Sequence, residues 1–322
     1  MARFLLRRIT LGLFVMFAVT VIVFGIFFVG PGPAYVAQRL AGRQATPDIV
    51  AAVRRRLQLD KPTYQQYWHF LTRLVWHHDL GYSYYHGQPV VSVLKEAFPI
   101  TLSLAIGASV MWLVLGVLSG ILSAVKRGSI ADRVVTVLAL FFYSMPVFVL
   151  GLLLLFIFYF KLTLAGIHLF PGQGYTYISA NPVKWFESLV LPWISLALIS
   201  AATYTRLTRG SMLDVMGEDY IRTARAKGLS ERRVIYRHAL RSALTPVVSQ
   251  FGIDVGGLLG GAILTEQVFG LPGLGWTAVQ SIENQDLPVI IGIVIIGAGA
   301  VVIANIVVDV LYAVLDPRVR LH

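Results

Sequence analysis

Four polar residues interrupt long apolar stretches of the chain, and they are its candidates for contact with a solute inside a membrane. Gln250 and Asp254 lie four residues apart, and Asn305 and Asp309 repeat that spacing further along. Residues at this spacing share one face of a helix. A charge in hydrocarbon costs at least about 2.5–3.5 kcal/mol, so each face should meet water or another helix. For Gln250 and Asp254, a translocation path and a structural hydrogen bond are equally open, whereas a structural pair is favoured for Asn305 and Asp309.

Other chemistries lack the residues that they need. The 322 residues include no cysteine, which excludes disulfides, thiolate metal sites and cysteine nucleophiles. No G-x-x-x-x-G-K-[ST] motif is present to cradle nucleotide phosphates. His77, His78 and Asp79 are adjacent, and adjacent side chains do not readily converge on one metal ion. We therefore expect no enzymatic activity and no metal or cofactor bound by this chain.

Glycines recur at helical spacing next to Asp254. One series is Gly252, Gly256 and Gly260, and the second is Gly257 and Gly261. Small residues four apart allow two helices to approach closely in lipid. The spacing favours static helix packing over an interface that slides during transport.

The elements that must position these residues are transmembrane helices. The chain is 57% hydrophobic and 13% charged, with a mean hydropathy of +0.73. About 20 apolar residues in a helix cross the hydrocarbon core. The long apolar runs are Ile9–Val29, Ile100–Val125, Val134–Phe160, Ser188–Tyr204, Val247–Thr265 and Pro288–Leu315. We predict an all-α integral membrane protein with six transmembrane helices.

The positive charges indicate the topology. The net charge is +11, and Lys and Arg flank the apolar runs and concentrate in alternate loops. Arg3, Arg7 and Arg8 precede the first run, and nine Lys or Arg lie in the loop between the fourth and fifth runs. Positive residues are retained on the cytoplasmic side, so both termini are predicted to be cytoplasmic. This distribution argues against nucleic-acid binding.

The chain divides into two parts on this reading. Residues 1–99 hold the first transmembrane helix and a long extracytoplasmic segment, and residues 100–322 hold five helices with a cytoplasmic loop at 206–246. Pro47 and Pro62 should open short helices in the outer segment. Aromatic residues on the second of these helices favour packing on neighbouring spans or contact with headgroups, with an external partner as the alternative. Glu266 is expected at the outer surface, as an interfacial charge or a gate.

Capping signals in the cytoplasmic loop predict a hairpin of two helices. Glu218 or Asp219 should start the first helix, and Gly228 can take the left-handed conformation that closes it. Ser230 should cap the second helix, with Glu231 in its first turn. Ala224, Ala226 and Gly228 would offer a smooth surface for a partner. Two interpretations stay open, a solvated loop near anionic lipid and a rigid lever inserted into a cytoplasmic protein.

Residues 218–246 resemble the cytoplasmic loop of permease subunits of binding-protein-dependent ABC importers, in the dipeptide/oligopeptide branch; their sequence is EDYIRTARAKGLSERRVIYRHALRSALTP. The resemblance extends over nearly the whole chain, through LRRI, DLGYS, RGSIADR, SMPVFVLG, LTRGSMLDV, GGLLGGAILTEQVFGLPGLG and LDPRVRL. The superfamily loop begins Glu-Ala-Ala, whereas Arg222-Thr223-Ala224 stands here, and Arg241 replaces a usual proline. The resemblance therefore carries over the shape and position of the loop, and not a contact by its glutamate.

The resemblance implies a type I ABC importer permease fold in a bacterial plasma (inner) membrane, moving peptides into the cytoplasm. The hairpin becomes the dock for an ATPase, through Asp219, Tyr220, Arg222, Thr223, Ala224, Lys227, Gly228, Glu231 and His238. Implied partners are a second homologous permease, two ATPase subunits that bind ATP and Mg, an extracytoplasmic substrate-binding protein and membrane lipid. Asp254 would then lie near the ammonium end of a peptide. A nickel or haem permease of the same family, and a self-contained channel or secondary transporter, stay open.

Overall fold

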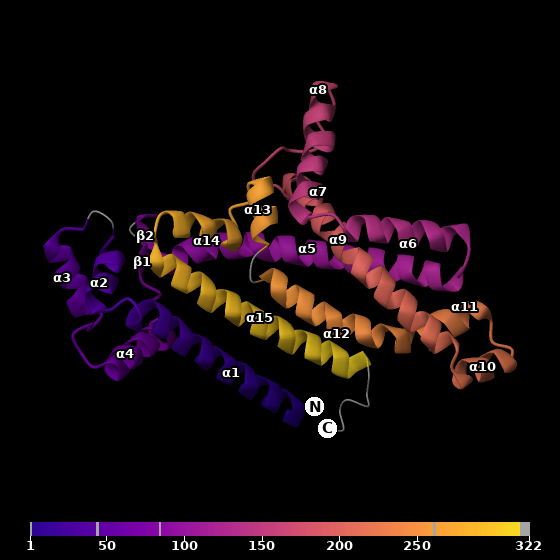
Figure 1. Cartoon of the computed structure of the whole chain (residues 1–322), viewed down its shortest axis with the longest axis horizontal. Coiled ribbons are helices and arrows are strands. Elements are labelled where there is room, and N and C mark those ends of the chain that lie inside the picture. Colours follow the sequence, from indigo (N-terminus) through magenta and orange to yellow (C-terminus); the bar gives the residue numbers. More distant parts are fainter. Residues whose placement is uncertain (1, 43–44, 84, 260–261, 316–322) are drawn as a thin grey trace.

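The computed structural model describes residues 2–42, 45–83, 85–259 and 262–315. Long helices run side by side through most of the molecule, and a group of short helices lies at each end of its long axis (Figure 1). A single two-stranded antiparallel hairpin, β1 (Tyr82–Ser83) with β2 (Gln88–Pro89), is the sheet structure within these ranges. The predicted all-α membrane fold is confirmed.

Five helices in the described ranges are long and apolar enough to cross a membrane. They are α1 (Ala2–Phe24) with η1 (Gly25–Val29), α5 (Val90–Val125), α7 (Val147–Leu154) with η2 (Leu155–Lys161) and α8 (Leu162–Leu164), α9 (Pro182–Met216), and α15 (Leu287–Leu315). A sixth span results if Glu231–Leu258 and α13 (Ile263–Phe269), bent by 57°, cross together. The predicted six spans therefore correspond to five whole helices and one bent pair.

The predicted third span, Val134–Phe160, is wrong in its bounds. The structure ends α6 (Ile130–Tyr143) at Ser144 and starts α7 after Pro146. Proline lacks the N–H that a helix interior needs and disfavours helical geometry in the residue before it. In Figure 1, α6 lies along α5, whereas α7 stands at a steep angle to both. The span in this region is Val147–Leu164.

The long helix α5 starts ten residues before the predicted Ile100, and Pro99 lies inside it. The proposed division between residues 99 and 100 therefore falls within a helix rather than at a break in secondary structure. Before it come α2 (Pro33–Ala41), α3 (Pro47–Arg56) and α4 (Thr63–Trp76). Tyr67 of α4 lies 5.3 Å, ring centre to ring centre, from Phe24 of α1, so part of the aromatic face packs on the first span.

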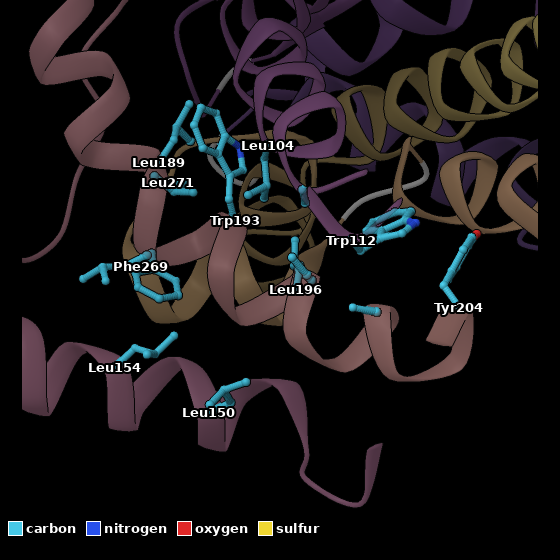
Figure 2. Close-up of a cluster of buried hydrophobic side chains, with 14 of the residues drawn as sticks. Leu104, Trp112, Leu150, Leu154, Leu189, Trp193, Leu196, Tyr204, Phe269 and Leu271 are labelled. Atoms are coloured by element: carbon cyan, nitrogen blue, oxygen red, sulfur yellow. The ribbon is translucent and has the colours of Figure 1, made fainter. Parts of the chain in front are cut away.

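A buried cluster between α5 and α9 forms the centre of the bundle. Trp112 of α5 and Tyr204 of α9 are 1% and 0% exposed, and both belong to the cluster drawn in Figure 2. Gly116 of α5 allows this approach, because a Cβ there would lie 2.4 Å from Cβ of Tyr204. The glycine-bearing face of α5 thus allows a close contact with α9, the helix that leads into the cytoplasmic loop.

The two ends of the bundle carry different elements. α10 (Asp219–Ala226) and α11 (Glu231–Arg233) lie at one end, here called the hairpin end (Figure 1). The other end, here called the distal end, carries α2, α3, α4 and the turn between α14 (Leu274–Glu283) and α15.

Candidate docking hairpin and polar clusters of the spans

The predicted helix–glycine–helix hairpin is present. α9 ends at Met216, α10 follows, and Gly228 has φ +74° before α11 begins. That left-handed conformation is readily adopted by glycine and strains most other residues. Glu218 and Ser230 occupy the predicted N-cap positions, but neither side chain makes the expected capping hydrogen bond. The backbone oxygen of Ser230 instead accepts bonds from later amides of the same turn.

The second arm of the hairpin is no separate helix. α11 passes through the π-helical segment η3 (Val234–Ala239) into α12 (Leu240–Leu259), with Pro246 inside the helix. Helix residues from 231 to 258 thus run continuously from the hairpin into the predicted fifth span. Gln250 and Asp254 therefore lie on the same continuous run of helix as the second arm of the hairpin.

One face of α10 packs on the bundle, and this overturns part of the predicted docking surface. Ile221 is fully buried and Ala224 is 7% exposed, in a cluster with Met212 and Val234. Ala224 therefore cannot offer a smooth outer surface; its small side chain allows α10 to lie close to its neighbours. Ala226 and Gly228 are exposed, as the prediction requires.

The outer face of the hairpin is polar and mostly paired within itself. Arg225 Nη2 donates to Glu231 Oε1 over 2.7 Å and joins the two arms. The other predicted docking residues on this face are exposed: Asp219, Tyr220, Arg222, Thr223 and Lys227. Tyr220 donates to Ser242 Oγ of α12 over 3.2 Å, and His238 of η3 is half-buried. The hairpin presents a preformed charged surface on a packed base.

A partly buried ion pair behind the hairpin was not anticipated from the sequence. Arg209 of α9 donates from Nε and Nη2 to the two carboxylate oxygens of Asp132, over 2.9 and 3.1 Å. Ser123 Oγ and the Gly128 amide also donate to Asp132. The Arg209 bonds, together with those two, hold the pKa of Asp132 well below its usual range. The available signal was the pair of motifs RGSIADR and LTRGSMLDV, which the fold brings together.

This ion pair gives an expected pH dependence. The unfolded pKa of Asp is about 3.9 and the folded pKa is lower, so the pair stabilises the fold fully above about pH 4 and less as pH falls further. Asp132→Asn should lower the melting temperature of the purified protein at pH 7. The difference from wild type should stay constant down to about pH 4 and narrow below it. A difference that does not change with pH would show that the charge of Asp132 is not the cause.

The structure brings Gln250 and Asp254 together, as their spacing predicts. Gln250 Nε2 donates to Asp254 Oδ1 over 2.9 Å, and Tyr204 Oη of α9 donates to Oδ2 over 2.9 Å. Asp254 thereby makes the structural hydrogen bond that was one of its two interpretations. The carboxylate remains half-buried rather than sealed, so its role in a translocation path stays a prediction.

Asn305 and Asp309 do not act as one unit. Asp309 forms an ion pair with Arg8 Nη2 of α1 over 3.0 Å, which ties the last span to the first. Asn305 is exposed on α15, and its Oδ1 lies 3.7 Å from the position of a Cβ on Gly256. Their spacing placed them on one face but did not reveal the different partners.

The glycine series has a more limited role than predicted. Gly252 packs on Val308, where an added Cβ would lie 2.6 Å from a methyl carbon, and Gly256 lies near Val301. An added Cβ on Gly257 would meet no described atom of this chain within 4 Å, so Gly257 packs on no other helix of the described chain and its packing role stays a prediction. Gly260 and Gly261 lie outside the described residues. The tightest glycine contacts along the spans were not singled out: Gly107, Gly116 and Gly120 of α5 against α9.

Glu266 is not at the surface. It is 0% exposed, its Oε1 accepts from Thr101 Oγ1 over 2.7 Å, and its Oε2 accepts from the Trp276 amide over 2.8 Å. The carboxylate joins α13, α5 and the first turn of α14. The expected interfacial charge is therefore wrong.

The outer histidines show no metal constellation. Among the described residues, no three His, Cys, Asp or Glu side chains are grouped to hold an ion. Asp79 instead accepts from Arg73 Nη2 over 2.7 Å and from the Gly81 amide over 2.8 Å. Burial opposes ionisation of this carboxyl, but those bonds hold its pKa below the usual value.

Comparison with known proteins gives consistent matches. Residues 116–321 match the family described as binding-protein-dependent transport system inner membrane component, and residues 1–105 match its N-terminal counterpart. The dipeptide transport system permease protein DppB of Escherichia coli (strain K12) is 39% identical over 346 aligned residues, covering 99% of each chain. In Sinorhizobium fredii, y4tP, named a probable peptide ABC transporter permease protein, is 36% identical and covers 99% of this chain and 100% of its own. An inward-facing structure of the MetNI methionine ABC transporter has a TM-score of 0.52 at 20% identity, covering 70% of this chain and 97% of that one.

Proposed function

Because the chain belongs to the family of inner membrane components of binding-protein-dependent transport systems, we propose that it is the permease subunit through which a bacterial ABC importer moves peptides into the cytoplasm. The peptide class rests on the names of relatives that are 36–39% identical over nearly full length. Nickel and haem remain the alternative cargoes. The ATPases, with their ATP and Mg, the second permease and the substrate-binding protein are separate chains.

The hairpin is the observation that carries the energy-coupling part of this proposal. Its inner face is anchored by Ile221, its two arms are joined by Arg225 and Glu231, and its second arm continues into α12. A rigid, charged projection of this kind suits insertion into a cleft of a cytoplasmic ATPase. In this proposal the ATPases move the hairpin, and α12 carries that motion to the polar groups of the span.

Reconstitution tests the proposal directly. The chain, copurified with a second permease and two ATPases, should import a tripeptide into proteoliposomes only when ATP and the binding protein are supplied. The chain alone should import nothing. Uptake by the chain alone, driven by a solute or ion gradient, would establish the rival channel or secondary transporter.

A substitution of Asp254 distinguishes a role in lining the translocation path from a purely structural role. Asn keeps an oxygen that accepts from Tyr204, and Gln250 can turn its amide so that its oxygen accepts from the new NH2 group, so Asp254→Asn should leave the melting temperature of the complex nearly unchanged. If the carboxylate meets the peptide ammonium, uptake of a free-amine peptide should fall about tenfold, the effect of about 1.4 kcal/mol, and uptake of the N-acetylated peptide should not fall.

Tyr204→Phe is the matched variant, because it removes the hydroxyl from the same hydrogen bond and leaves the charge. It should lower the melting temperature without changing the preference between the two peptides. Equal uptake of both peptides by wild type and Asp254→Asn would end the path role of this carboxylate.

A further inference from the structure

A cleft of about 720 Å³ opens at the distal end, between α2 and the turn that joins α14 to α15. Small-molecule sites typically span about 300–1,000 Å³, so the cleft has the size of a ligand site. Seven of its lining residues carry polar side chains: Tyr35, Gln38, Arg39, Tyr85, Asn284, Gln285 and Asp286. The hairpin and the polar clusters of the spans contribute none of them.

Arg39 is the cation of this cleft. Its guanidinium lies 5.0 Å from the centre of the Tyr35 ring and donates through Nη1 to Gln285 Oε1. These contacts orient the group without neutralising it, and a guanidinium has five N–H donors. Arg39 has no carboxylate partner in the part of the chain that the structure describes. Its remaining donors can take a carboxylate from a ligand in bidentate geometry.

Three neighbouring arginines have a carboxylate partner, whereas Arg55 of α3, like Arg39, has none among the described residues. Arg54 pairs with Asp60, and Arg56 and Arg73 both pair with Asp79. These pairs neutralise the cations that stabilise the α3 and α4 region. Arg39 differs from them because its neighbours are a ring and an amide.

Asp286, the acidic residue of the cleft, already has hydrogen-bond partners in the protein. Asp286 is 6% exposed, accepts from the buried Ser83 hydroxyl, and lies 3.4 Å from His86 Nδ1. Asp286 therefore does not compete with a ligand for Arg39.

The remaining polar groups suit a peptide bond beside that anion. The side-chain amides of Gln38, Asn284 and Gln285 each offer both a donor and an acceptor, as a peptide group does. Gln285 has φ +58°, a conformation that is costly for a residue with a side chain and is often kept at functional sites.

We propose that this cleft binds the carboxylate end of a short peptide. Arg39 takes the carboxylate, and the amide side chains pair with the adjacent peptide group. The peptide class rests on the proposed function, whereas the need for a carboxylate follows from Arg39 itself. The site lies at the distal end, outside the spans, so the substrate binds there before it enters the spans.

Binding of trialanine and of its C-terminal amide tests the proposal. The full permease–ATPase complex in nanodiscs, without the binding protein, is equilibrated with each radiolabelled peptide. Wild type should bind the free acid about tenfold more tightly than the amide, since one charge-assisted pair is lost. Arg39→Gln should weaken free-acid binding by about the same factor and remove the discrimination. Arg55→Gln, at an exposed arginine of α3 outside the cleft, should bind like wild type.

Equal binding of acid and amide by wild type, or unaltered binding by Arg39→Gln, overturns the proposal. So does a result in which Arg39→Gln weakens capture of the substrate-binding protein but leaves trialanine binding intact, because the cleft is then a protein-docking surface. Uptake assays of the wild-type complex with its binding protein are read separately. Acid-selective binding without any peptide uptake would reject the importer function and keep the cleft.

Discussion

Ile221→Asp is expected to abolish ATP-driven uptake while leaving the spans folded. Ile221 is fully buried at the base of the hairpin against Met212 and Val234. A carboxylate there has no cation in the cluster, and burying an unpaired charge costs several kcal/mol. α10 is eight residues long and buries only Ile221 and Ala224, so it should detach before the bundle unfolds. The measurement is retention of ATPase subunits on an affinity-tagged chain, together with uptake in proteoliposomes.

Ile221→Val is the matched control. It removes one methylene, typically costing about 0.5–1.5 kcal/mol, and should retain both the ATPases and uptake. A monodisperse gel-filtration profile of the Asp variant would show that the bundle survives. Retained ATPases and uptake in the Asp variant would mean that the packed hairpin is not the dock.

Local signals predicted the hairpin well because its features depend on neighbouring residues. Gly228 takes the left-handed conformation that its position in the chain suggests, and α10 spans the predicted segment. The continuity of α11 with α12 was missed, because the charges of the loop separated the hairpin from the apolar run that starts at Val247. At Ser144–Pro146 the opposite error occurred. Hydropathy stayed high there, so one span was predicted across a position where one helix ends and another begins.

The polar pairs were less predictable because their partners are far away in the chain. Spacing placed Gln250 and Asp254 on one face, but only the fold shows that Tyr204 completes the group. Thr101 and Glu266 are 165 residues apart, and the sequence around Glu266 suggested a surface position. A periodic pattern specifies which face of a helix is polar, whereas the packing of the helices decides which groups form hydrogen bonds with the residues on that face.

Gly116→Leu is expected to have the second large effect. A Cβ at this position would lie 2.4 Å from Tyr204 Cβ and 3.0 Å from the Ala201 carbonyl oxygen, so a larger side chain must separate α5 from α9. Overpacking alone typically costs about 1–3 kcal/mol. Displacing Tyr204 also breaks its bond to Asp254, and an unsatisfied buried group costs about 1–3 kcal/mol more. The melting temperature of the purified complex should fall markedly, and uptake should be lost.

The matched substitution, Gly210→Ala, lies on α9 itself and meets no atom within 4 Å. Alanine is favoured over glycine in a helix by about 1 kcal/mol, so this variant should be as stable as wild type or slightly more stable. If Gly116→Leu melts like Gly210→Ala, the close approach of α5 and α9 does not constrain the bundle. If Gly116→Leu has a low melting temperature but retains uptake at low temperature, the close contact of α5 and α9 stabilises the fold without positioning Asp254. Loss of both at every temperature is the expected result, because Tyr204 is at once part of the core and the partner of that carboxylate.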